Sequence, residues 1–238
     1  MKNYESRFIN YLQKRTYTII RLSIEDFRNY SKNFNKPFDY DITSSLRVAI
    51  KGLCHKVQGL KFAYSYGNEI ILLFTDFDNP GTRQWLNGNR DSILSITTSI
   101  VSDGFNKSMY ESQIKNLMKD PVVSVETFIK YLDFAYFKGA CFQIADRNDV
   151  IDYIVGAQES CILNCMKKYS EELDGFSNGM TANNMSRLLE RNEVYVEEMP
   201  AYEKWGSMMH TTEEFRMSEC RDAINFRSDI ESLNNWIP

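Results

Sequence analysis

The sequence predicts an α+β fold in which a mostly antiparallel sheet is backed by helices and is followed by a helical carboxy-terminal part. Residues 60–76 give the clearest signal, because two apolar runs flank Gly67 and Asn68, which both tolerate the positive φ of a tight turn. The second run, EIILLFTD, is too uniformly apolar for an exposed edge and belongs in the centre of a sheet. A strand and a helix precede this hairpin and a helix follows it, an order that favours the α+β class.

The elements before the hairpin follow from the spacing of apolar residues. Residues 2–14 carry an aromatic or apolar residue at every fourth position, which predicts a short amphipathic helix. The β-branched run at 15–23 predicts a buried strand. Residues 23–34 predict a helix or a structured loop, and Pro37 then breaks the chain. Apolar residues at three- and four-residue steps predict a helix over 42–59.

Four further elements are expected after the hairpin. They are a helix at 90–109, a strand at 135–145, a long helix at 149–173 and a short helix at 181–192 with Thr181 as its cap. The segment 108–132 is too polar to assign from its pattern. The tail over 205–238 mixes charged and aromatic residues, and no chemistry is assigned to it.

Composition and charge narrow the class of protein. The chain has 238 residues, of which 43% are hydrophobic and 25% charged, and this predicts an ordinary soluble globular protein. Its net charge of -4 confines any nucleic-acid site to one face. The amino terminus is polar, and no run approaches the roughly 20 apolar residues of a membrane helix. We therefore expect a cytoplasmic protein with no membrane partner.

The five cysteines are odd in number, and this favours reduced thiols. Cys161 and Cys165 are spaced to lie on one face of a helix and could offer two metal ligands. With His55 and His210 as the two histidines of the chain, a closed zinc site is not expected. Cys161 and Cys165 are therefore interpreted as core residues.

Several stretches resemble the tRNA-His guanylyltransferase family, in particular its short bacterial and phage-type members that polymerise in the 3′ to 5′ direction. These stretches are KNYESR, RTYTIIRL, KPFDYD, TDFDNPGTRQWLNGN, FKGA and NNMSRLLERNEVYVEEMPAYEKWG, which together extend over residues 2–207. The resemblance implies a polymerase- or cyclase-like palm, here expected over residues 1–147. A helical carboxy-terminal region, residues 148–238, is expected to pack on it, or the two parts to form one domain. It also implies a homo-oligomer, a dimer or a homotetramer.

The resemblance implies two-metal nucleotidyl transfer, in which carboxylates hold paired cations. The family's first carboxylate, in R-I/L-D-G-K/R-x-F, falls on Ser23, and the second, in Q-S-D-E, falls on Asn68, next to Glu69. A hydroxyl and an amide are neutral and compensate two dications poorly. No intact catalytic set and no metal are therefore expected. Mg²⁺ would be a cofactor if Glu25, Asp26 and Glu69 held displaced ions.

Other family positions are changed as well. The lysine within the family motif W-F-x-x-N-x-Q-K-I falls on Ser92, and the histidine of F-H becomes Arg28. The motif F-D-x-R becomes Phe137-Lys138-Gly139-Ala140, and W-R-Q-x-D becomes Val155-Gly156-Ala157-Gln158-Glu159. The asparagine later in that helix falls on Leu163, beside Asn164. The scaffold stretches remain while these positions change together. This pattern is typical of a pseudoenzyme, so catalysis is uncertain and its absence is favoured.

The resemblance also suggests which residues would contact a nucleotide or a phosphate. They are Lys14, Arg15, Ser23, Ile24, Glu25, Asp26, Phe27, Arg28, Lys36, Gly67 and Asn68. The alternative for the basic positions is that they are solvated charges beside strands. Glu25 and Asp26 have the alternative role of favourable charges at a helix amino terminus. Trp85, Phe27 and Phe137 have the alternative role of scaffold packing.

Three hypotheses for function remain. The first is a catalytically degenerate palm that binds or sequesters a nucleotide, a nucleotide signal or a tRNA end without turnover. Such a site can keep its contacts to the ligand after it has lost the groups that stabilise the transition state. The second is an active nucleotidyltransferase that adds a nucleotide to a tRNA 5′ end with a rearranged metal site. The third is a structural protein or a regulatory partner of an active paralogue.

Overall fold

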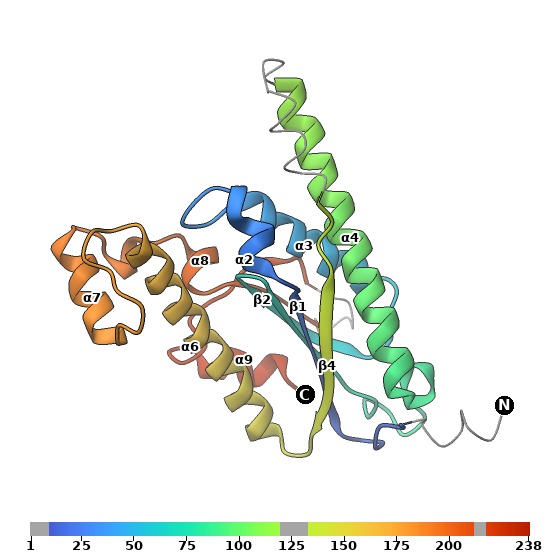
Figure 1. Ribbon diagram of the computed structural model, residues 1–238. Helices are drawn as coiled ribbons and strands as arrows, with labels where there is room; N and C mark the ends of the chain where they lie inside the picture. Colours follow the sequence, from blue (N-terminus) through green and yellow to red (C-terminus); the bar gives the residue numbers. More distant parts are fainter. Residues whose placement is uncertain (1–9, 120–132, 212–217) are drawn as a thin grey trace.

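A computed structural model of the chain describes residues 10–119, 133–211 and 218–238. Its centre is a six-stranded antiparallel sheet in the order β4-β1-β3-β2-β5-β6 (Figure 1). The strands are β1 (Tyr17–Ile24), β2 (Leu60–Tyr66), β3 (Glu69–Phe74), β4 (Phe137–Ile144), β5 (Ser207–His210) and β6 (Arg221–Asp222). The expected α+β class and the antiparallel sheet are thereby confirmed.

Helices lie on both faces of this sheet (Figure 1). They are α2 (Phe27–Tyr30), α3 (Tyr40–Cys54), α4 (Arg90–Lys119), α6 (Arg147–Glu171), α7 (Ala182–Arg191), α8 (Ala201–Lys204) and α9 (Ile230–Trp236), with short 3-10 turns η2 (Ser31–Asn33), η3 (Trp85–Gly88) and η4 (Val196–Glu198). The helices expected around 42–59, 149–173 and 181–192 are present with shifted ends. Asp39 begins α3 by accepting a hydrogen bond from the backbone N–H of Asp41, and the side chain of Asp146 does the same for α6.

The hairpin has the geometry that its sequence predicts. Tyr66 pairs with Glu69 across the turn, and Gly67 adopts a φ of 54°. β3 lies between β1 and β2, and Leu72 and Leu73 are fully buried on its two faces. A strand with neighbours on both sides and helices on both faces has no polar side, so its continuous apolar run is explained.

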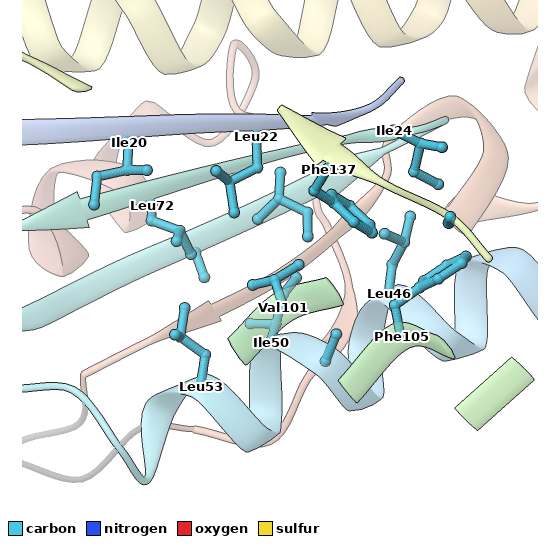
Figure 2. Packing of buried hydrophobic residues seen from close by; sticks show 14 of the residues in the cluster. Ile20, Leu22, Ile24, Leu46, Ile50, Leu53, Leu72, Val101, Phe105 and Phe137 are labelled. Atoms are coloured by element: carbon cyan, nitrogen blue, oxygen red, sulfur yellow. The ribbon is translucent and has the colours of Figure 1, made fainter. Parts of the chain in front are cut away.

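The first face of the sheet packs on α3 and α4 (Figure 2). Leu22 of β1, Ile50 of α3 and Phe105 of α4 are almost fully buried in this cluster. Gly104 allows the two helices to approach, since an added Cβ would lie 3.1 Å from the Cα of Ala49. Each large apolar side chain buried here contributes roughly 1.5–3 kcal/mol to stability.

The second face of the sheet packs on α6 and on the end of the chain. Ile154 and Phe226 are fully buried there. The side-chain amide of Gln158 donates to the carbonyl oxygens of Trp205 and Ile224 and accepts a hydrogen bond from the backbone N–H of Phe226. These bonds satisfy a buried amide and fix the carboxy-terminal segment to α6.

Several expectations need correction. The predicted helix at 2–14 falls mostly outside the described residues, and in its described part Tyr11 forms an isolated β-bridge with Asn89. The helix expected to end near residue 109 continues to Lys119. The carboxy-terminal part is helical apart from β5 and β6, which add to the sheet beside β2. Strands of four and two residues are too short to show a sequence period.

Cys161 and Cys165 lie in the core, as their spacing indicated, and are almost fully buried. The cysteines of the described residues are free thiols. Burial raises the pKa of Cys161 to about 12, which keeps the thiol protonated and unreactive at neutral pH. Over residues 10–119, 133–211 and 218–238, no helix is both long and apolar enough to cross a bilayer.

Candidate functional site

The tip of the β2–β3 hairpin meets the end of β1. The backbone N–H of Ile24 donates to the carbonyl oxygen of Asn68 at 3.1 Å, and the side-chain amide of Asn68 donates to the carbonyl oxygen of Ile24 at 3.4 Å. Ser23 pairs in register with Glu69. The two positions that carry the family's carboxylates are therefore neighbours in space, as the resemblance implied.

Glu69 is held by two side chains of the sheet. The guanidinium of Arg21 donates from Nε to Oε2 at 2.9 Å and from Nη2 to Oε1 at 2.6 Å, and the hydroxyl of Tyr66 donates to Oε2 at 2.8 Å. The pKa of Arg21 is raised by its hydrogen bond to Glu69. The pKa of Tyr66 is raised first by burial and then by its hydrogen bond to Glu69. Both oxygens of Glu69 are thus engaged within the protein.

On the other side of Ser23, β4 places Lys138 in register with it. The ammonium of Lys138 lies 2.7 Å from Oε2 of Glu25. Asp26 follows in a left-handed conformation, with a φ of 45°, and is exposed. Lys138 therefore lies beside Ser23, at the position where the F-D-x-R pattern has a carboxylate. Lys138 also pairs with Glu25, one of the acids that could have held a displaced metal ion.

The donors at this site do not fit a pair of Mg²⁺ ions. Mg²⁺ takes hard oxygen ligands in near-octahedral geometry, and carboxylates supply the balancing charge. Ser23 and Asn68 are neutral, Glu25 and Glu69 are paired with cations, and Asp26 is a single exposed carboxylate. In the part of the chain that the structure describes, no three His, Cys, Asp or Glu side chains are grouped to hold a metal ion.

A cleft lies beside the hairpin tip, lined by the segment from α2 to α3 and by the carboxy-terminal half of α6. Its walls are mainly aromatic and apolar, with polar and charged groups between them. The residues that line it are Phe27, Ser31, Phe34, Asn35, Lys36, Pro37, Phe38, Asp39, Ile42, Thr43, Gly67, Asn164 and Lys168. Of the residues predicted to bind a nucleotide, the structure brings Phe27, Lys36 and Gly67 together here.

Two lysines face this cleft. Lys36 donates weakly to the carbonyl oxygen of Ser31 at 3.4 Å, and the Nζ of Lys168 lies 5.9 Å from the ring centroid of Phe27. Burial is the main cause that lowers the pKa of Lys168, and repulsion from Lys36 is the second cause. The cleft is thus electropositive and partly desolvated, a combination that favours anions.

Sequence reasoning missed Lys168, and it treated Asn164 as an imperfect substitute. The two lie four residues apart on α6 and therefore on one face of the helix. Asn164 lies beside the hairpin tip, since a Cβ added to Gly67 would lie 3.2 Å from its Nδ2. The spacing of a polar and a basic residue was a usable signal, but only tertiary packing shows which face of α6 meets the hairpin.

Other predicted residues lie elsewhere. Lys14 and Arg15 precede β1 at the end opposite Ser23, roughly 25 Å along the strand. There the backbone N–H of Arg15 donates to Oδ1 of Asp76. Arg28 is exposed on α2 and does not line the cleft. The structure therefore does not join Lys14, Arg15 and Arg28 to the cleft.

Two of the aromatic residues belong to the packing. The ring of Trp85 stacks on that of Phe74, with centroids 6.1 Å apart and an interplanar angle of 2°. Phe137 meets Phe105 edge to face at 5.5 Å in the first core. The packing interpretation of Trp85 and Phe137 agrees with these contacts.

Comparison with solved structures gives the same fold. A bacterial tRNA(His) guanylyltransferase (Thg1)-like protein in complex with ATP matches with a TM-score of 0.83 and 22% identity, covering 100% of this chain and 97% of that one. Its complex with GTP matches with a TM-score of 0.76 at 22% identity and the same coverage. The tRNA(His) guanylyltransferase of Saccharomyces cerevisiae matches with a TM-score of 0.69 at 14% identity, covering 96% and 100%.

Sequence comparison adds a relative and a family. An uncharacterized protein of Acanthamoeba polyphaga mimivirus is 23% identical over 220 residues, which are 87% of this chain and 74% of the relative. The family model described as tRNAHis guanylyltransferase matches residues 1–144, more than half of the chain. By this match and by the palm-like sheet described above, the chain belongs to the tRNA-His guanylyltransferase family.

Proposed function

We propose that this protein binds a nucleotide-type ligand in the cleft beside the hairpin tip and does not turn it over. The observation that carries the proposal is the contrast between two adjacent sites. At the metal positions, Ser23 and Asn68 are neutral and Glu69 is bound by Arg21. Beside them, the cleft keeps two cations and aromatic walls.

This contrast separates binding from catalysis. A transferase must stabilise charge that develops on the attacking and leaving oxygens, and this family's chemistry depends on metal-bound carboxylates for it. A binding protein needs contacts to the ground state of its ligand, which lysines and aromatic rings supply. The solved relatives with ATP and GTP support a nucleotide as the ligand class.

The first experiment is mass spectrometry of whatever small molecule or RNA is released when the purified protein is denatured. We expect a nucleotide or nucleotide-derived molecule near one per subunit. Calorimetry with AMP, GMP, ATP and GTP, each with Mg²⁺, then measures affinity. Lys36→Ala is expected to weaken binding, whereas Lys51→Ala, at an exposed position of α3 outside the cleft, is the matched control.

The same proposal excludes turnover. If the protein adds a nucleotide to a tRNA 5′ end in the presence of Mg²⁺, and Glu69→Gln abolishes this activity, the proposal of binding without turnover is wrong and the protein is an active transferase. A protein that binds neither nucleotides nor tRNA would instead be a scaffold or a regulatory partner of an active paralogue. The proposal also includes homo-oligomerisation as a dimer or a tetramer, which light scattering tests. It further includes a cytoplasmic location, which cell fractionation tests.

A further inference from the structure

Lys36 and Lys168 face one cleft without an acidic partner. Within the described residues, the ion pairs of the chain involve other cations, and neither lysine forms one. Asp39 also lines the cleft, but its Oδ1 accepts the backbone N–H of Asp41 and its Oδ2 that of Asn35. This carboxylate therefore serves as the cap of α3, and its charge offsets only one of the two lysines.

The two lysines repel each other, although Lys36 is exposed and only Lys168 is partly buried. The lowered pKa of Lys168 has this repulsion as its second cause, after burial. Part of the ammonium's hydration is replaced by the face of Phe27, at 5.9 Å. An anion between the two lysines would remove the repulsion and restore the lost solvation.

The amount of charge indicates which anion fits. The lining carries two positive charges on the lysines and one negative charge on Asp39, so a phosphomonoester, with about −1.5 to −2 at neutral pH, comes closer to balancing it than a di- or triphosphate does. Each further phosphate of a di- or triphosphate adds negative charge that a bound cation normally balances. Ser23, Asn68 and the paired acids Glu25 and Glu69 do not offer the ligands for that cation.

We infer that the cleft holds the phosphate of a nucleoside monophosphate directly through Lys36 and Lys168, without a metal ion. The base would pack against the aromatic and apolar wall formed by Phe38 and Ile42. This inference rests on the proposed function and adds two statements to it. The ligand is a monophosphate, and binding is independent of divalent cations.

Calorimetry in EDTA and in Mg²⁺, with AMP, GMP, ATP and GTP as probes, tests both statements. We expect the monophosphate affinity to be unchanged by EDTA, and the triphosphates to bind more weakly than the monophosphates in EDTA. Lys168→Gln is expected to weaken monophosphate binding roughly 10- to 100-fold, because a charged hydrogen bond is lost. Lys167→Gln is the matched control, since Lys167 is exposed, does not line the cleft and pairs with Glu171.

The outcomes separate the two proposals. Binding that needs Mg²⁺, or that favours triphosphates in EDTA, overturns the metal-free monophosphate site and leaves the nucleotide-binding proposal intact. Absence of nucleotide binding under every condition overturns both. Unchanged affinity in Lys168→Gln assigns the phosphate to other residues and also overturns the inference.

A second measurement uses the unmodified protein and so does not depend on a variant that folds. Acylation of lysines, read by mass spectrometry, should modify Lys168 readily because its lowered pKa leaves more of the neutral amine. Saturating monophosphate in EDTA should protect Lys168 and Lys36 but not Lys167. Equal labelling of these lysines with and without the monophosphate would contradict the inference.

Discussion

The guanidinium of Arg21 donates hydrogen bonds to both carboxylate oxygens of Glu69, from Nε to Oε2 at 2.9 Å and from Nη2 to Oε1 at 2.6 Å. The two residues lie on neighbouring strands and on the same face of the sheet. The side chain of Glu69 is 19% exposed, whereas that of Arg21 is 48% exposed. The acid nearest to the family's second metal position is thus part of a structural ion pair.

This pair should contribute measurably to stability. We expect Glu69→Gln to lower the free energy of unfolding by about 1 kcal/mol, since a bidentate, partly buried pair exceeds the usual surface pair. A double-mutant cycle with Arg21→Ala in urea measures the coupling. The exposed pair of Asp103 and Lys107 on α4 is the comparison and should couple by about 0.3–0.5 kcal/mol. A coupling at Arg21 and Glu69 no larger than this would contradict the prediction.

Restoring both carboxylates should restore metal binding. The double variant Ser23→Asp with Asn68→Asp is expected to bind Mn²⁺ in calorimetry, because two adjacent carboxylates supply the missing charge. Without metal, repulsion near Glu69 should lower its stability by about 1 kcal/mol, and Mn²⁺ should raise its Tm again. The variant Ser99→Asp with Asn183→Asp adds the same charge at exposed helix positions and should not bind. If the two double variants bind Mn²⁺ equally, these are not metal positions.

Monophosphate binding should weaken as the pH rises. Burial and Lys36 lower the pKa of Lys168 below its ordinary 10.5, and Lys167, Glu171 and Glu172 on α6 contribute smaller effects. The anion binds the protonated lysine, so affinity is full below the lowered pKa and falls as the pH passes through it. The phosphate itself stays doubly charged above about pH 7.

Calorimetry between about pH 7 and pH 10 checks this dependence. Lys168→Arg should flatten the alkaline fall, because a guanidinium stays protonated over that range. A wild-type affinity that is constant over the same range would remove Lys168 from the ligand contact.

The turn residue Gly67 should be sensitive to a side chain for two reasons. Its φ of 54° disfavours other residues, and an added Cβ would lie 3.2 Å from Nδ2 of Asn164. We expect Gly67→Ala to destabilise the protein by about 1 kcal/mol and to weaken nucleotide binding by moving Asn164.

Gly179 provides the control for backbone strain alone. It has a φ of 89° and nothing within 4 Å of an added Cβ. Gly179→Ala should therefore lose similar stability in urea and keep its nucleotide affinity. If Gly67→Ala also keeps its affinity, the contact with Asn164 has no part in binding.

The sequence by itself determined the local elements and the chemistry of the changed positions. Gly67 and Asn68 predict the hairpin, and in the structure Gly67 supplies the positive φ of the turn, whereas Asn68 does not adopt one. The apolar run of β3 places it in the sheet centre, because a strand buried on both faces has no polar side. The motif frame places Ser23 and Asn68 at the metal positions, and the structure shows these residues side by side.

Only the tertiary structure decided which distant residues share the cleft. Lys168 and Arg15 are both basic residues near family motifs. Lys168 faces Phe27 because α6 packs across the sheet, whereas Arg15 lies at the far end of β1. The engagement of Glu69 by Arg21 depends on strand register, which side-chain type does not reveal. The four residues of β5 join the sheet because β2 offers an unpaired edge, and so short a segment carries no period of its own.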